Sequence, residues 1–180
     1  MLRKLLNTLS RHALKKPEPN RERPRGPVRP AEWYFEADGH FKLTLTSHWT
    51  EHASDEAEQW LFHSEFHQAS ITLSMMLVDL PLDKMRGTAE VMANARREAE
   101  QDIRAARNVR FSDYWTQKED DRHVWHVTYE AADDASISMF TCWVTQRKVL
   151  SFYIDVQTRD RNYARRQFEA LHAGFEFAVP

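Results

Sequence analysis

Residues 149–158, VLSFYIDVQT, have the clearest strand pattern in the chain. Apolar and more polar side chains alternate through this stretch, which is the period of two that places successive residues on opposite faces of a sheet. The apolar set is Leu150, Phe152, Ile154 and Val156. We therefore predict a β-strand here, with one face buried in a core.

Three more strands are predicted upstream of this one, at residues 109–117, 123–130 and 136–145. Short polar stretches separate the four strands, and such connections favour antiparallel hairpins. The four strands together predict an antiparallel sheet.

Two helices are predicted around this run of strands. From Asp83 to about Arg107 the apolar residues recur at steps of three or four, which is the spacing of a long amphipathic helix. The positions in phase are Met85, Ala89, Met92, Ala95 or Arg96, Ala99, Ile103 and Ala106. A closing helix is expected to begin after Asp160, a good N-cap residue, and to end at Gly174.

The part of the chain before the long helix is also predicted to form strands. Residues 33–37 and 40–45 flank Asp38-Gly39, a strong signal for a two-residue hairpin. An acidic loop at residues 51–58 and two strands, at 59–63 and 69–79, should follow. We expect an α+β domain over residues 32–180: an antiparallel sheet of about six to eight strands, with one long central helix and one C-terminal helix packed on it.

The first thirty residues differ sharply from the rest in charge. They hold nine Lys and Arg and two Glu, a net charge of +7. Since the whole chain sums to −2, residues 31–180 carry −9. Such an acidic body repels phosphate, so nucleic-acid binding is not expected.

Residues 1–16 are expected to form a basic amphipathic helix or a tail, and residues 17–31 a Pro/Arg-rich linker. The apolar stripe of the helix is Leu2, Leu5, Leu6, Leu9 and Ala13. Three roles stay open for it: a solvated tail, docking on a partner or on its own domain, and contact with an anionic membrane surface.

The chain lacks the marks of a membrane-spanning or secreted protein. No stretch approaches the roughly 20 apolar residues of a spanning helix, and Asn7 and Thr8 interrupt the short leucine run that a signal peptide would extend. Cys142 is the only cysteine, which excludes an intrachain disulfide. We expect a cytoplasmic protein, peripheral to a membrane if the arm binds one. In a eukaryote, residues 1–17 would have the composition of a mitochondrial presequence.

The chemistry of most common sites is missing from the sequence. Four scattered glycines exclude a P-loop or dinucleotide fingerprint, and Cys142 lies in an apolar strand where a thiol is usually a core residue. Three close histidine pairs leave a metal site as an alternative, although a zinc site usually has four ligands. These pairs are His48 with His52, His63 with His67, and His123 with His126. We expect no catalytic residue, no metal and no cofactor.

The order of elements adds a resemblance to a known family. An entry hairpin carries Phe41-x-Leu43-x-Leu45-x-x-x-Trp49, and the chain closes on Phe175-Glu176-Phe177 after the last helix. This order resembles the Mog1/PsbP-like superfamily, which includes DcrB-type bacterial proteins, over about residues 33–178. Thr46 or Ser47 stands where that family usually has proline. The resemblance implies a binding, assembly or chaperone role rather than an enzyme.

Aromatic and methionine side chains supply the candidate binding residues. Two helices leave part of one sheet face uncovered, and Tyr, Trp and Met are enriched at recognition surfaces. The candidates are Met75, Tyr114, Trp125, Trp143 and Tyr153, with Leu2, Leu5, Leu6 and Leu9 on the arm. We expect a non-catalytic protein-binding, adaptor or chaperone-like domain with a protein partner, or with a second copy of itself. The alternatives are a small metal-binding or enzymatic domain using the histidine pairs, and a peripheral membrane protein anchored by the arm.

Overall fold

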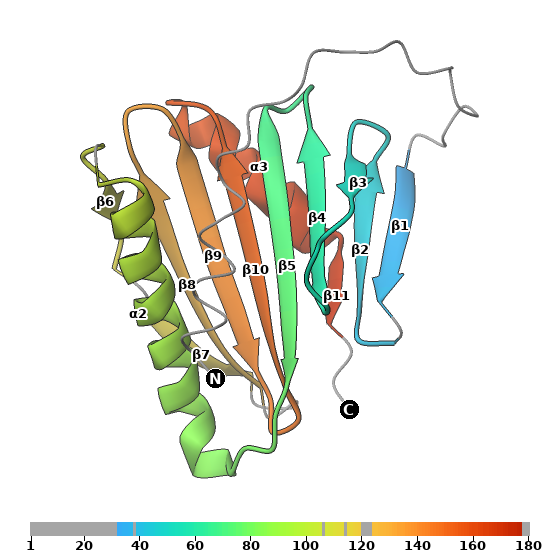
Figure 1. Cartoon of the computed structure of the whole chain (residues 1–180), viewed down its shortest axis with the longest axis vertical. Helices are drawn as coiled ribbons and strands as arrows, with labels where there is room; N and C mark the ends of the chain where they lie inside the picture. The colour runs from blue at the N-terminus through green and yellow to red at the C-terminus, as the bar shows by residue number, and fades with distance from the viewer. Residues whose placement is uncertain (1–31, 38, 106, 114, 120–123, 178–180) are drawn as a thin grey trace.

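The computed structural model describes residues 32–37, 39–105, 107–113, 115–119 and 124–177 (Figure 1). The predicted N-terminal helix and linker, residues 1–31, lie outside this part of the chain. In chain order the elements are β1 Glu32–Ala37, β2 Phe41–Thr46, β3 Thr50–His52, β4 Gln59–Ser64, β5 Ala69–Leu77, the 3-10 helix η1 Leu82–Lys84, α2 Met85–Ile103, β6 Arg110–Phe111, β7 Trp115–Glu119, β8 Val124–Ala132, β9 Ile137–Val144, β10 Lys148–Val156, α3 Arg161–Ala173 and β11 Phe175–Phe177.

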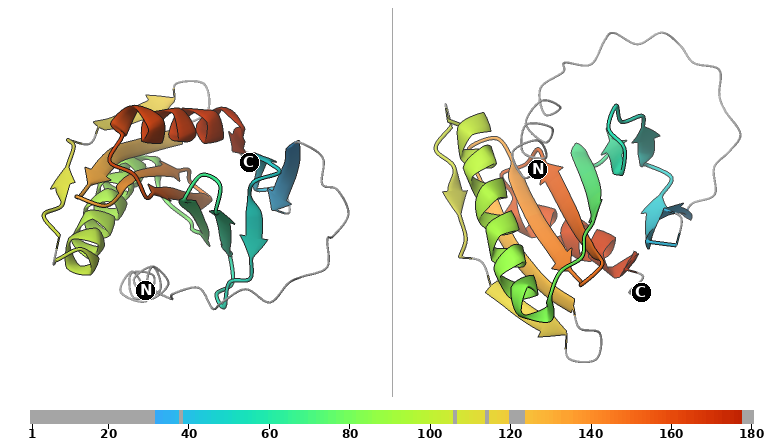
Figure 2. Two further views of the ribbon diagram at one scale, coloured as in Figure 1. Left: turned by 90° about the horizontal axis from the view of Figure 1, so that it is seen from above. Right: turned by 60° about the horizontal axis from the view of Figure 1, so that its bottom comes forward.

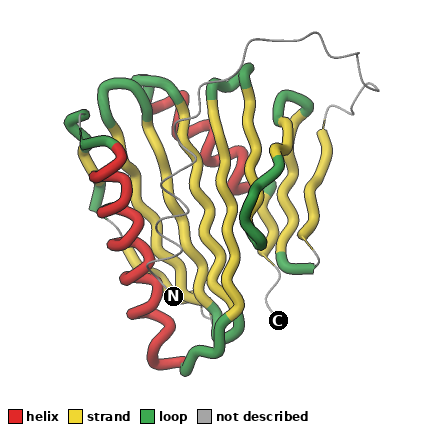
Figure 3. Tube along the Cα trace, in the orientation of Figure 1, coloured by secondary structure: helices red, strands yellow, loops and turns green. Residues whose placement is uncertain are grey.

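The described strands form two antiparallel sheets (Figure 3). The larger sheet has eight strands in the order β3-β4-β5-β10-β9-β8-β6, with β7 also paired to β8. The smaller sheet has the order β1-β2-β11. The predicted strand at 149–158 is β10, which lies in the middle of the larger sheet, and there Phe152 pairs with Leu73 on one side and Thr141 on the other. The expected α+β class is confirmed.

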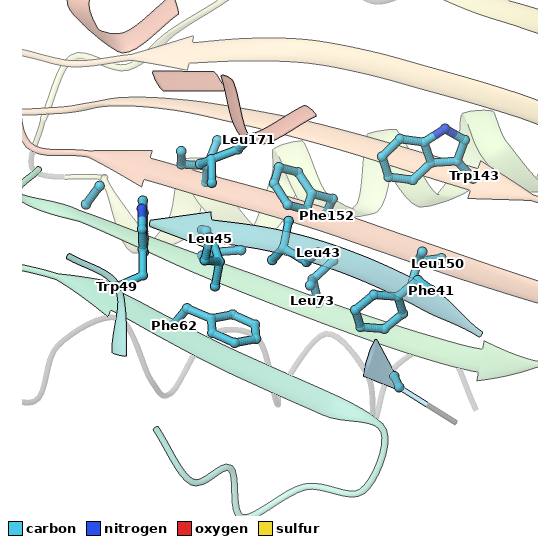
Figure 4. Close-up of a cluster of buried hydrophobic side chains, with 14 of the residues drawn as sticks. Phe41, Leu43, Leu45, Trp49, Phe62, Leu73, Trp143, Leu150, Phe152 and Leu171 are labelled. Carbon is cyan, nitrogen blue, oxygen red and sulfur yellow. The ribbon is translucent and has the colours of Figure 1, made fainter. Parts of the chain in front are cut away.

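The two helices lie on opposite faces of the larger sheet (Figure 2). Helix α2 packs on β7, β8 and β9, whereas α3 and the smaller sheet cover the other face. The core is accordingly divided into two clusters, one on each side of the sheet. Figure 4 shows the larger cluster, where Phe41, Leu43 and Leu45 of β2 lie against Leu73, Leu150 and Phe152.

Helix α3 begins and ends as its sequence predicts. The Asp160 side chain accepts hydrogen bonds from the backbone amides of Asn162 and Tyr163, which have no partner inside the helix. At the other end, the Gly174 carbonyl accepts a hydrogen bond of 2.8 Å from the Thr44 amide. A Cβ at Gly174 would lie 3.0 Å from the Thr44 carbonyl oxygen, so this close approach to β2 requires glycine.

Three predicted boundaries differ from the structure. The single strand expected at 109–117 is divided into β6 and β7, which pair with two separate parts of β8. The expected acidic loop contains the short strand β3. The long helix begins at Met85, because residues 82–84 form a 3-10 turn after Pro81.

Helix α2 is the longer helix of the described chain, with 19 residues. Neither it nor α3 is both long and apolar enough to cross a membrane.

Candidate partner-binding surface

The α2 side of the larger sheet is covered over only part of its width (Figure 1). Most residues on β3, β4 and β5 that point to this side are exposed or half-buried. The exceptions lie at the end of β5 near Ser74, where Gln59 is buried and bonded by Ser54, and Met76 packs in the cluster under α2. We call the exposed and half-buried surface the open face. It consists of Thr50, His52, Leu61, His63, Ser70, Thr72 and Ser74.

Strand pairing fixes where the open face ends. Thr72 pairs with Leu61 on one side and with Tyr153 of β10 on the other, so these three side chains form one row across the sheet. The next residue in the row, Phe140, is buried in the cluster beneath α2. Tyr153, half-buried, therefore marks the border between the covered and the open parts of the sheet.

One flank of α2 borders the open face. Arg97 contacts the rings of Phe111 and Tyr129, which places its side of the helix toward β6. Because an α-helix turns by about 100° per residue, Val91 and Ala95 lie on the opposite flank, toward β10 and β5. Val91 is 50% exposed, so this flank presents an apolar edge beside the open face.

A buried ionic network holds α2 on the sheet. Glu100, 1% exposed, accepts hydrogen bonds from Tyr129 Oη and Ser138 Oγ, each at 3.2 Å, and it pairs with Arg96 Nε at 3.4 Å. The Arg96 guanidinium, also buried, lies 3.9 Å from the centre of the Tyr153 ring. The network therefore spans β8, β9 and β10 beneath one helix.

Arg104, just beyond the end of α2, extends this network. Its Nη2 is 2.8 Å from Asp155 Oδ1 and 3.1 Å from Tyr153 Oη, and its Nη1 is 3.3 Å from Asp133 Oδ2. Burial raises the pKa of Asp155, and Arg104 offsets only part of that effect. Burial would also raise the pKa of Asp133, but the amides of Ala135 and Ser136, together with Arg104, bring it below its ordinary value.

The sequence analysis missed this network. Arg96 and Glu100 are four residues apart on α2 and in phase with Met85, Ala89 and Met92, which are all buried. This shared spacing with buried residues was the signal in the sequence that Arg96 and Glu100 face the core. Charged residues are rarely fully buried unless they are paired, so the pattern alone favoured an exposed Arg96.

A comparison with solved structures identifies the architecture. The solution structure of cyanobacterial PsbP (CyanoP) from Synechocystis sp. PCC 6803 matches with a TM-score of 0.65 and 12% identity, covering 86% of this chain and 97% of that one. The chain has a PsbP-like fold. A structure from Bacteroides thetaiotaomicron VPI-5482 is 13% identical with a TM-score of 0.43, covering 82% of this chain and 49% of that one. No family model and no curated protein matches the sequence.

The resemblance inferred from the order of elements is thus confirmed at the level of the PsbP-like fold. At 12% identity, this fold establishes the arrangement of helices and sheets. The residues of a site must be argued from this chain itself.

The candidate binding residues lie on both sides of the PsbP-like sheet. Met75 and Trp143 are buried, 8% and 5% exposed, in the cluster on the α3 side. Trp125 and Tyr153 are half-buried in the cluster under α2. The described candidates therefore do not form one surface, and only Tyr153 borders the open face. Tyr114 and the arm residues Leu2, Leu5, Leu6 and Leu9 lie outside the described residues.

The histidines are brought together in pairs other than the sequence suggested. The His63 ring is 6.1 Å from that of His52, and the His67 ring is 5.7 Å from that of His48. His67 Nδ1 lies 3.3 Å from Tyr163 Oη, and burial, with a smaller effect of His48, lowers the pKa of His67. Among the described residues, no three His, Cys, Asp or Glu side chains are grouped as a metal site would need.

A small hollow lies between α3 and the larger sheet. It is lined by Glu130, Met139 and Phe168, among others, and its volume of about 10 Å³ is no more than a single water molecule needs. Small-molecule sites usually measure about 300–1,000 Å³. The open face is therefore the better candidate for a functional surface.

Cys142 is fully buried on β9, and its thiol should be inert in the folded protein. Burial raises its pKa to about 12, although Ser151 Oγ donates a weak hydrogen bond to the sulfur at 3.9 Å. Because the thiolate is the reactive form, we expect a thiol reagent such as DTNB at pH 8 to label the native protein at least about a thousandfold more slowly than the protein in urea. Release of thionitrobenzoate measures both rates, and equal rates would contradict the buried placement.

Proposed function

We propose that this chain is a non-catalytic protein-binding domain of the adaptor or chaperone type, which holds a segment of a protein partner against the open face. The observation that carries the proposal is the incomplete cover of the α2 side, where the residues of the open face are exposed or half-buried.

The open strip has the width of one helix. Strands lie about 4.8 Å apart, so the three spacings from β10 to β3 span about 14 Å. A helix with its side chains is about 10–12 Å in diameter. We therefore infer that the partner segment is an amphipathic helix lying beside α2.

The strip combines small polar side chains with a few apolar ones. Ser70, Thr72 and Ser74 are short, so they allow a helix to approach the sheet closely. Leu61, on β4 within the strip, and Val91, on the flank of α2, supply apolar contact, and Tyr153 offers a ring at the border. By contrast, the buried charges of the network are bonded to one another beneath α2, and this arrangement supports a binding role over a catalytic one.

A bulky cation at the centre of the open face tests the proposal. Thr72→Arg should reduce the amount of bound partner at least tenfold, because it fills the space that a helix would occupy. Affinity capture with full-length wild-type and variant chains, followed by quantitative mass spectrometry, measures the retained proteins. Circular dichroism should show the same secondary structure in both.

Thr46→Arg is the matched control. Thr46 is exposed on β2 of the smaller sheet and is not part of the open face. The variant should retain the same proteins as the wild type. If Thr72→Arg keeps every protein that the wild type retains, the open face is not the binding surface.

A further inference from the structure

We propose that the occupant of the open face, when no partner is bound, is the chain's own N-terminal segment, residues 2–13. This inference rests on the binding face proposed above and names what covers it. The segment is the one stretch outside the described residues whose sequence has a helical apolar stripe. It would lie beside α2 with its leucines on the sheet and its basic residues toward solvent.

The segment has the length and polarity that the strip requires. Twelve helical residues extend about 18 Å, and the nine residues of β5 extend about 30 Å. Leu5, Leu6 and Leu9 lie on one side of such a helix, and Arg3, Lys4 and Arg11 lie mostly off that side. An isolated helix of this length is marginal in water, so burial of its leucines on the sheet would supply the missing stability.

Charge favours the same placement. Residues 1–30 carry +7 and the remainder carries −9. Exposed acidic side chains lie at one end of the open face, where the loop before β4, with Asp55 and Glu58, lies beside Ser74. Asp102 is also exposed on the flank of α2 that borders the strip.

The linker is long enough for the segment to reach the open face. Residues 17–31 number fifteen, and a proline-rich chain extends about 3.1 Å per residue, or roughly 45 Å in all. A domain of about 150 residues is roughly 40 Å across. The linker is therefore long enough to span the width of the domain.

Disulfide trapping in the full chain tests the placement. In a Cys142→Ala background, one variant carries Leu9→Cys with Thr72→Cys, on the open face, and a second carries Leu9→Cys with Thr46→Cys. Thr46 pairs with Glu32, where the linker joins the domain, so an undocked arm would meet position 46 at least as often as position 72. We expect the pair with position 72 to cross-link at least tenfold faster under mild oxidation, at monomer mass. Adding Leu5→Glu and Leu6→Glu should abolish this preference, and 0.5 M salt should weaken it.

Each result decides the inference. Equal rates at the two positions, or a preference that survives Leu5→Glu with Leu6→Glu, would overturn it. Cross-linked dimers in place of monomers would also overturn it, since the occupant would then be the arm of a second copy. None of these results changes the outcome of partner capture with Thr72→Arg, so the binding face and its intramolecular cover can fail separately.

Discussion

Replacing Glu100 by alanine is expected to lower the free energy of unfolding by about 3–5 kcal/mol, the usual cost of removing one partner of a buried ion pair. The substitution leaves the buried Arg96 guanidinium without its carboxylate, and it removes the acceptor of Tyr129 Oη and one of the two acceptors of Ser138 Oγ. Urea denaturation followed by circular dichroism measures the change. Since α2 is held on the sheet by this network, its amides should also exchange faster than in the wild type.

Two further variants show whether the loss of stability in Glu100→Ala comes from the buried ion pair. Glu98→Ala, on the exposed side of the same helix, should change the free energy of unfolding by less than about 0.5 kcal/mol. Arg96→Leu combined with Glu100→Leu should cost less than Glu100→Ala alone, because no unpaired charge is left inside. A loss below about 1 kcal/mol for Glu100→Ala would show that the carboxylate is solvated in solution and that the network is not closed.

Replacing Trp143 by alanine is expected to cost about 3–5 kcal/mol of stability, the range for deleting a buried aromatic side chain. The indole ring stacks on Phe175 at 4.8 Å between ring centres, and it also contacts Phe177 and Phe152. It therefore joins the larger sheet to the last strand of the smaller one. Chemical denaturation measures the effect, and loss of near-ultraviolet circular dichroism should accompany it.

Trp125→Ala is the matched comparison. Trp125 is half-buried on β8, with the Arg86 guanidinium 5.7 Å from its ring, so its loss should cost clearly less than that of Trp143. A Trp143→Ala variant that keeps wild-type stability and yet loses a bound protein would show that Trp143 contacts a partner directly.

The strands and helix ends were predictable because local rules determine them. β5 from Ala69 to Met75 and β10 from Leu150 to Val156 alternate between an apolar and a more polar face, so the period of two is clear. Asp160 and Gly174 mark the two ends of α3 with the capping chemistry that their residue types favour. The order of these elements was then sufficient to predict the PsbP-like fold.

The candidate site was less accessible to sequence reasoning, because it depends on which strands α2 covers. Trp125 and Trp143 both lie on strong strands, yet pairing places them in different clusters. The periodicity of the sequence does not determine which strands of the sheet a helix covers. The residues of the open face, such as Ser70 and Thr72, are of the same types as those on an ordinary solvated strand face.

The close approach of Gly174 to Thr44 has a consequence for how the protein is made. The smaller sheet needs β11, residues 175–177, as the neighbour of β2, residues 41–46. A ribosome delivers the chain from its N-terminus, so the first hairpin must wait until residues 175–177 have been made before this neighbour emerges. Such long-range pairing slows folding, and it leaves the β2 edge open to chaperones during synthesis.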